Sequence, residues 1–115
     1  MSTLKHPTDY TDGIASLIDG HATGLIFKHS PTCDLSAMAH VEVSQYTAEA
    51  SAIEVLLVDV IHQRAMSNRI ETELSLRHES PQAILLEKGR VVWHASHRRV
   101  TAAAIRDAVA AVAGG

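Results

Sequence analysis

The 115-residue sequence predicts a single α/β domain, spanning 1–115, in which a mixed four-stranded sheet is covered by helices on both faces. Two observations predict this three-layer sandwich. Short apolar runs, typical of buried strands, alternate with segments in which apolar residues recur at helical spacing. With 46% hydrophobic residues, a chain of this length also has enough apolar surface to build one core of useful size.

The first half of the chain alternates helix, strand and helix. Apolar spacing predicts a helix over Asp9–Asp19, which Gly13 weakens. The apolar run Gly24–Phe27 indicates a strand buried on both faces, and the Ser30-Pro31 dipeptide ends it. A second helix is expected over Asp34–Glu49. Its apolar positions at helical spacing are Leu35, Met38, Ala39, Val43 and Tyr46.

The middle of the chain holds its most β-prone segment. Ile53–Ile61 is rich in valine, leucine and isoleucine, and it is too continuous for an exposed edge strand. We therefore expect a central parallel strand there. Helical spacing returns over Arg64–Leu76, and a helix that joins two parallel strands implies a right-handed crossover.

The last part of the chain predicts a hairpin and a closing helix. Strands are expected over Ala83–Glu87 and Arg90–His94, joined by the short Lys88-Gly89 turn. A helix over Thr101–Ala113, with Thr101 as its N-terminal cap, completes the chain.

Among small folds, this order of elements is the thioredoxin arrangement. It places the end of the first strand, and therefore Cys33, beside the loop that contains Ser80 and Pro81. Proline is uncommon just before a strand unless it ends a turn, and a thioredoxin-like sheet has a cis-proline at this place. We therefore expect a cis Ser80-Pro81 bond; the alternative is an ordinary trans proline in a loop.

Cys33 is the only cysteine in the sequence, and it lies where the first buried strand gives way to a helix. Unpaired amide groups and the helix dipole at a helix N-terminus stabilise a thiolate, the form of cysteine that attacks disulfides. Thr32 and Ser36 supply hydroxyls that can hydrogen-bond the sulfur or cap the helix. The alternative is an inert buried cysteine. The Ser30-Pro31-Thr32 turn and the polar neighbours favour a nucleophile instead.

Composition and charge exclude several classes of partner. The net charge is −3 and basic residues form no block, so a nucleic-acid partner is not expected. No apolar run resembles a signal peptide or reaches the length of a membrane span. We therefore expect a cytoplasmic protein without a membrane partner. A single cysteine also allows disulfides only with another molecule.

The eight histidines suggest a metal site only weakly. His94 and His97 form the single closely spaced pair, whereas zinc sites usually show two such pairs. His29 and His78 are expected at the same edge of the sheet as Cys33. We predict no metal site, and the alternative function is a binding module in which Cys33 and nearby histidines hold a metal or an iron-sulfur cluster between two protomers.

Several blocks of the sequence are similar to the monothiol bacilliredoxins, and together they span nearly the whole chain. These blocks are Phe27–Ser30, Thr32, Cys33, Ser36, Val58–Ile61, Ser67-Asn68, Arg77–Gln82 and Val92–His97. The resemblance implies a thioredoxin-like fold and a monothiol disulfide reductase. Such an enzyme removes bacillithiol, or a similar low-molecular-weight thiol, from S-thiolated client proteins and holds no bound cofactor.

Carried over by position, the resemblance implies that Cys33 is the nucleophile. It places the active-site loop at Thr32, Asp34, Leu35 and Ser36. The family loop usually reads Thr-Cys-Pro-Ile-Ser, so Asp34 and Leu35 depart from it. A carboxylate at position 34 opposes thiolate formation, although an acidic residue in the first turn also stabilises a helix.

Arg98 and Arg99 are a second departure, because the family tends to have tryptophan and aspartate there. A guanidinium binds a carboxylate through two hydrogen bonds, and bacillithiol carries carboxylates on its malyl group. The alternative is that both arginines are solvated surface charges. Thiol or partner binding is thus predicted for the set His29, His78, His94, His97, Arg98 and Arg99.

Overall fold

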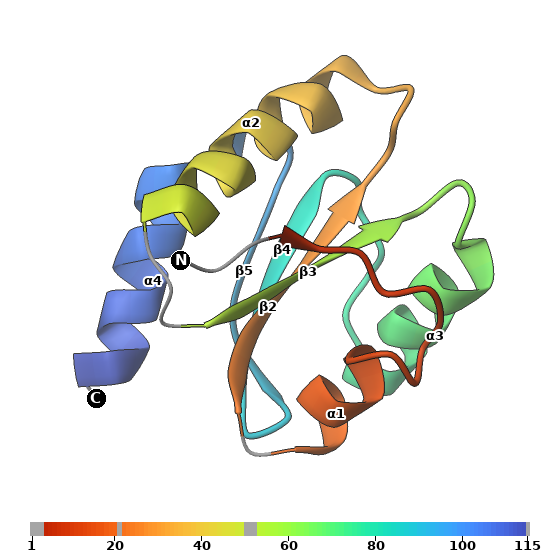
Figure 1. Cartoon of the computed structure of the whole chain (residues 1–115), viewed down its shortest axis with the longest axis horizontal. Helices are drawn as coiled ribbons and strands as arrows, with labels where there is room; N and C mark the ends of the chain where they lie inside the picture. Colours follow the sequence, from red (N-terminus) through yellow and green to blue (C-terminus); the bar gives the residue numbers. More distant parts are fainter. Residues whose placement is uncertain (1–3, 21, 50–52, 115) are drawn as a thin grey trace.

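The computed structural model describes residues 4–20, 22–49 and 53–114, which form one five-stranded sheet between two pairs of helices (Figure 1). The strands are β1 (Leu4–Lys5), β2 (Thr23–His29), β3 (Glu54–Asp59), β4 (Gln82–Glu87) and β5 (Arg90–Ser96). The helices are α1 (Ile14–Asp19), α2 (Asp34–Glu49), α3 (Arg64–Leu74) and α4 (Ala102–Gly114), with a short 3-10 helix η1 (His97–Arg99). The predicted three-layer α/β sandwich is confirmed.

The strands lie in the order β1-β3-β2-β4-β5. Parallel pairing joins β1 to β3 and β3 to β2, whereas β2, β4 and β5 pair in antiparallel fashion. β3 is therefore an inner strand, as its continuous apolar sequence predicts. The hairpin turn is also confirmed, since Lys88 and Gly89 both have positive φ, as a tight two-residue turn requires.

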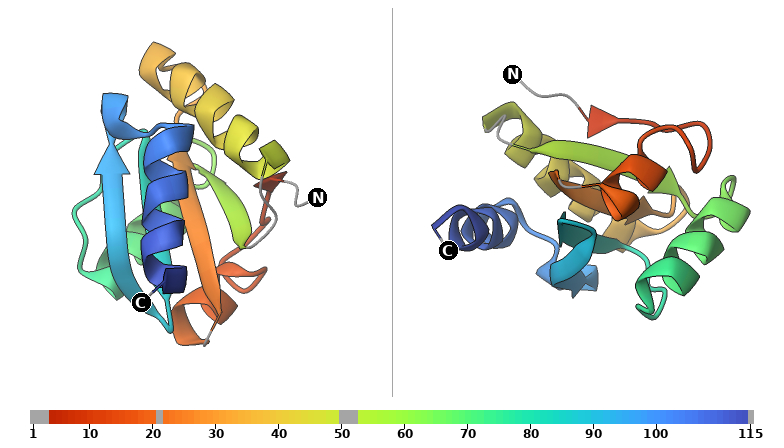
Figure 2. Two further views of the ribbon diagram at one scale, coloured as in Figure 1. Left: turned by 90° about the vertical axis from the view of Figure 1, so that its left-hand side faces the viewer. Right: turned by 90° about the horizontal axis from the view of Figure 1, so that it is seen from below.

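Each face of the sheet has its own apolar core. Helices α2 and α4 cover one face, and α1 and α3 cover the other (Figure 2). The side chains of β2 alternate between the two, because Leu25 and Phe27 pack beneath α2 and α4 whereas Ile26 packs with α1 and α3. All three are completely buried, and burial of one such side chain contributes roughly 1.5 to 3 kcal/mol.

The number of strands and the start of the first helix differ from the sequence prediction. The fifth strand, β1, is only two residues long and pairs Leu4 with Val55. Its shortness leaves no alternating pattern to read. The first helix begins at Ile14 instead of Asp9, because Gly13 has a φ of 97° and the residues before it form a turn.

The other boundaries shift by a few residues, and α2 has the predicted bounds. Helix α3 ends at Leu74 because Ser75 adopts a left-handed conformation and its N–H bonds to the carbonyls of the last turn. Thr101 caps α4 as predicted, since its hydroxyl accepts the N–H of Ala104 at 3.1 Å. β3 is shorter than predicted at both ends, and β2, β4 and β5 are longer.

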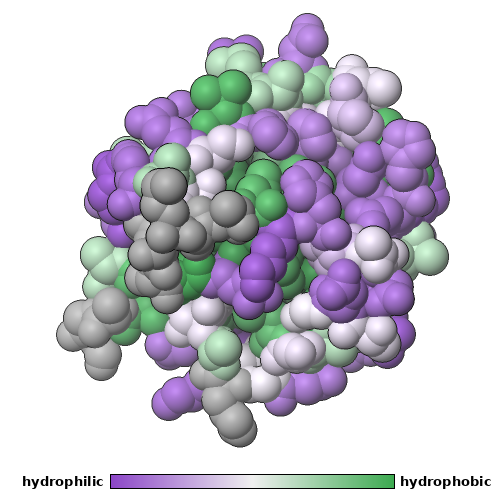
Figure 3. Space-filling view, viewed as in Figure 1, coloured by the Kyte–Doolittle hydropathy of each residue, from purple (hydrophilic) through white to green (hydrophobic). Residues whose placement is uncertain are grey.

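The face of the molecule seen in Figure 1 is mostly polar. Figure 3 shows polar side chains over much of one face, with smaller apolar areas between them. Among the described residues, no helix combines the length and apolar character that a membrane span requires.

Candidate active site

Three turns meet at one end of the sheet, and they carry most of the predicted site residues. Strand register sets this arrangement, because Lys28 of β2 pairs with Gln82 of β4, which in turn pairs with Ser96 of β5. The turn after β2, the loop before β4 and the segment after β5 are therefore neighbours. They contain Cys33, Pro81 and η1, respectively.

Cys33 lies at the N-terminus of α2, where the sequence predicts it. Its N–H donates to the carbonyl of Ser30 at 3.2 Å, and its own carbonyl accepts the first helical hydrogen bond, from Ala37, at 3.0 Å. Cys33 is therefore the N-cap residue of α2, beside the unpaired amides of the first turn. Cys33 is a free cysteine, and the residue is partly exposed.

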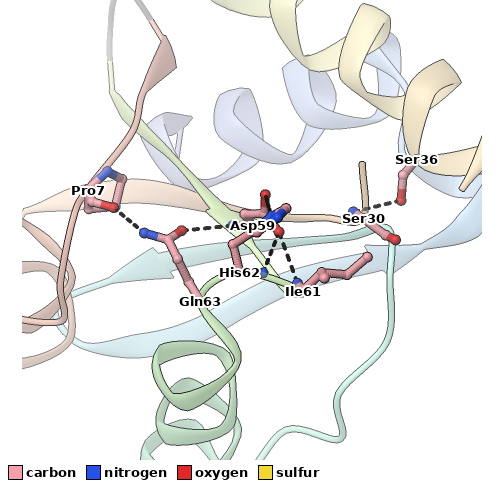
Figure 4. A network of polar contacts seen from close by, with 7 residues as sticks. All are labelled: Pro7, Ser30, Ser36, Asp59, Ile61, His62 and Gln63. Carbon is pink, nitrogen blue, oxygen red and sulfur yellow. Dashed lines mark hydrogen bonds and ion pairs between the residues drawn. The ribbon is translucent and has the colours of Figure 1, made fainter. Parts of the chain in front are cut away.

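Ser36 anchors the turn that presents Cys33. Its hydroxyl is completely buried and accepts the N–H of Ser30 at 3.1 Å (Figure 4). The sequence suggests a bond to the sulfur or a cap for this residue, whereas the structure gives it a contact with the backbone of the preceding turn. Thr32 is exposed on that turn, and Asp34 is exposed in the first turn of α2.

A polar network around Asp59 supports the neighbouring strand end. The Asp59 carboxylate accepts the N–H groups of Ile61 and His62, each at 2.9 Å, and contacts His62 Nδ1 at 2.8 Å. Gln63 accepts the Asp59 N–H and donates to the carbonyl of Pro7 at 2.7 Å (Figure 4). Partial burial raises the pKa of Asp59, but the hydrogen bonds from His62 and Ile61 outweigh it and lower that pKa.

The Ser80-Pro81 bond is cis, as predicted. Pro81 is buried, and its carbonyl accepts the N–H of His97 at 2.9 Å, which holds η1 against the proline loop. The buried side chain of Gln82 braces the same loop by donating to the carbonyl of Arg77 at 3.1 Å. The predicted packing of Pro81 against Cys33 stays a prediction.

An open cavity of about 480 Å³ lies between these segments. Its lining comprises Leu35, Glu79, His94, Ala95, Ser96, His97, Arg98 and Arg99. The structure thus brings five of the predicted residues together. A hydrogen bond from Ser96 lowers the pKa of Glu79, and His97 and Arg77 add to the effect, so the cavity holds a carboxylate among cationic groups.

A second, more apolar cavity of about 530 Å³ continues from the first along α2, sharing Leu35, His97 and Arg98 with it. Met38 and Val41 line it and are both 63% exposed. Met38, one of the apolar positions that predict this helix, therefore lies outside the core, because this side of α2 faces η1 instead of the sheet.

His29 and His78 do not face one site. The His29 ring packs 5.1 Å from that of His40 and 5.6 Å from that of Phe27, on the α2 face of the sheet. Burial, and then the neighbouring His40, lower the pKa of His29. The His78 ring contacts Lys28 on the opposite face. Among the described residues, no three His, Cys, Asp or Glu side chains are placed to hold a metal ion.

The model of the monothiol bacilliredoxin family BrxC matches residues 7–105 of this chain. The chain belongs to the monothiol bacilliredoxin family. This confirms the resemblance read from the sequence, and it makes the protein a thiol oxidoreductase of the thioredoxin fold. Cys33 lies within the matched region, as do Pro81 and both arginines after β5.

Solved structures confirm the fold. A solved structure titled as an oxidoreductase with a thioredoxin fold matches with a TM-score of 0.83 and 24% identity. The match covers 93% of this bacilliredoxin and 94% of that chain. Thioredoxin from Trypanosoma brucei brucei has a TM-score of 0.77 at 9% identity, and the match covers 98% of this chain and 93% of that thioredoxin. A point mutant of Halobacterium salinarum thioredoxin has a TM-score of 0.74 at 17% identity, and the match covers 96% of this chain and 93% of that thioredoxin. At these identities the likeness establishes the fold alone.

The Ser36 contact predicts a measurable loss of stability. We expect Ser36→Ala to lower the free energy of unfolding by about 1 to 2 kcal/mol, because it removes the buried acceptor of the Ser30 N–H. Denaturant unfolding of Ser16→Ala, an exposed serine on α1, supplies the matched control. Equal unfolding midpoints for the two variants would contradict the anchoring role.

Proposed function

We propose that this bacilliredoxin releases bacillithiol, or a similar low-molecular-weight thiol, from S-thiolated client proteins, and that it does so in the cytoplasm. The observation that carries the proposal is the position of Cys33, which is partly exposed at the N-cap of α2. It is also the only thiol in the sequence. A disulfide formed during turnover must therefore join Cys33 to another molecule.

The reaction needs two thiol-disulfide exchanges. First, the Cys33 thiolate attacks the bacillithiol sulfur of the mixed disulfide; the new bond joins Cys33 to bacillithiol, and the client cysteine leaves as a thiolate that takes up a proton from water. Second, the thiolate of another bacillithiol molecule attacks the bacillithiol sulfur held on Cys33. Bacillithiol disulfide leaves, and the Cys33 thiolate is regenerated. Each exchange conserves electrons, and the second bacillithiol is the net reductant.

The residues around Cys33 contribute position and charge. Ser36 fixes the turn before the cysteine, and Cys33 lies at the N-cap of α2, a position that in proteins generally favours an anion. Asp34, where the family loop usually has proline, is exposed in the same first turn of α2.

The cavity beside the site supports a small polar thiol as substrate. It begins at Leu35 in the first turns of α2 and extends to η1, where Arg98 and Arg99 contribute two exposed guanidinium groups. Glu79 on the opposite loop adds a negative charge. Such a lining fits a ligand that carries carboxylates and other polar groups, and it complements the malyl group of bacillithiol.

We expect Cys33→Ser to abolish release of bacillithiol from a thiolated client and to leave the fold intact. The hydroxyl replaces the sulfur with little change in volume, but it is a far weaker nucleophile near neutral pH. Cys33→Ala should behave in the same way. Released bacillithiol is measured by mass spectrometry and the fold by circular dichroism. Turnover retained by either variant would exclude the monothiol mechanism, because the sequence offers no other cysteine.

The cavity also predicts which substrates depend on Arg98 and Arg99. Arg98→Ala or Arg99→Ala should slow release from a bacillithiol-modified client by up to about tenfold, since both groups are exposed and solvent weakens a charged contact. Release of a neutral thiol of similar size should not change. Arg90→Ala, an exposed arginine at the start of β5, is the control. Equal rates for all variants on both clients would make the two arginines surface charges.

A further inference from the structure

Lys28 is a completely buried lysine in the middle of the sheet, and the reductase reaction does not use it. It lies on β2, five positions before Cys33, with its side chain toward α3. Its ammonium donates to the carbonyl of Ser67 at 3.2 Å and lies 3.2 Å from Nδ1 of His78. A buried charge is costly unless it is hydrogen-bonded, so these partners are what allow the lysine to stay there.

His78 belongs to the segment that leads into the cis-proline. Its backbone N–H donates to the carboxylate of Glu71 at 2.6 Å, and the hydroxyl of Ser67 lies 3.4 Å from its Nδ1. An ammonium group can only donate, so the contact with Lys28 requires a lone pair on Nδ1. The neutral ring therefore carries its proton on Nε2. The cluster joins β2, α3 and the proline loop, three elements that meet beside the site.

The cluster has room for one positive charge between Lys28 and His78. Protonation of His78 would place a second N–H at Nδ1, facing the ammonium across 3.2 Å, and would remove the acceptor that the ammonium uses. Glu71 offsets part of that repulsion, and Glu79 offsets a smaller part. Arg64 of α3 adds to it.

We propose that Lys28 and His78 form a proton-controlled latch on the cis-proline loop. When the pair carries one positive charge, on Lys28, the ammonium donates to the neutral His78 ring, and residues 75–81 stay fixed against β2. A second proton breaks the Lys28–His78 hydrogen bond and releases this segment. The contacts that form the latch do not involve the substrate, so it can be tested without turnover. Its effect on the reaction rests on the proposed reductase function.

The direction of the pH dependence follows from the surroundings of His78. Burial lowers its pKa, Lys28 lowers it further, and Glu71 raises it. The unfolded chain therefore takes up this proton near pH 6.5, whereas the folded chain takes it up at lower pH. Between the two values the unfolded state binds more protons, so the stability that this group contributes is lost as the pH falls below about 6.5. Lys28, whose pKa burial lowers to about 8, carries the charge of the pair at neutral pH.

NMR titration of the His78 ring and of the amides of residues 75–81 tests the latch on the whole chain, without bacillithiol. In the wild type, the ring and the loop amides should titrate together at a pH below 6.5. Lys28→Met keeps most of the side-chain volume and removes the charge that lowers the His78 pKa, so it should raise the His78 midpoint toward the value of an ordinary histidine. His78→Asn keeps an acceptor near the Nδ1 position and cannot take up the proton, so the acid transition of the loop should vanish.

Two further variants keep the test decisive. Lys88→Met makes the same change at an exposed turn and should leave the His78 midpoint unchanged. If Lys28→Met fails to fold, Glu71→Gln replaces it; this variant retains an acceptor for the His78 N–H and should lower the midpoint. A midpoint that neither Lys28→Met nor Glu71→Gln moves, or a loop transition that persists in His78→Asn, would overturn the latch. Inactivity toward thiolated clients alongside the expected titrations would instead overturn the proposed function.

Discussion

The pairing of β2 with β4 is the constraint on which the rest of the structure depends. Because Lys28 lies opposite Gln82, the turn that carries Cys33 and the loop that carries Pro81 emerge at the same end of the sheet. The same register sends Phe27 into one core and Lys28 into the other. A slip of one residue would exchange these two side chains, placing an ammonium beneath α2, so the apolar alternation of β2 also protects the geometry of the site.

The two faces of the sheet differ in the side chains that they bury. Beneath α2 the core is apolar, and it fixes the helix whose first turn presents the cysteine. Beneath α3 the core accepts a lysine, a serine and part of a histidine, joined by hydrogen bonds that reach the proline loop. The chemistry needs one sulfur and one helix start. The polar contacts of Ser36, Lys28 and His78 hold the turn before Cys33 and the segment before Pro81. Each of these side chains bonds to a group on a different element of the fold.

Much of this arrangement could be predicted from the sequence, because it depends on local signals. The bounds of α2, the position of Cys33 and the cis bond at Pro81 follow from apolar spacing, turn residues and element order. Strand β1 was missed because two residues carry no pattern. The contacts of Lys28 and Ser36 were missed because they join side chains to groups that only the fold brings close. The available signal was that Lys28 directly follows the apolar run Gly24–Phe27, because a residue that continues a strand buried on both faces is itself buried.

In the proposed reaction, Cys33 takes the small thiol, and not the client protein, into the intermediate disulfide. Intact-mass spectrometry of the protein after a single incubation with a bacillithiol-modified client, with no free bacillithiol present, tests this most directly. We expect Cys33 to gain the mass of one bacillithiol moiety while the client appears as the free thiol. A disulfide-linked complex of Cys33 with the client as the main product, or a client that stays modified beside an unmodified Cys33, would contradict it.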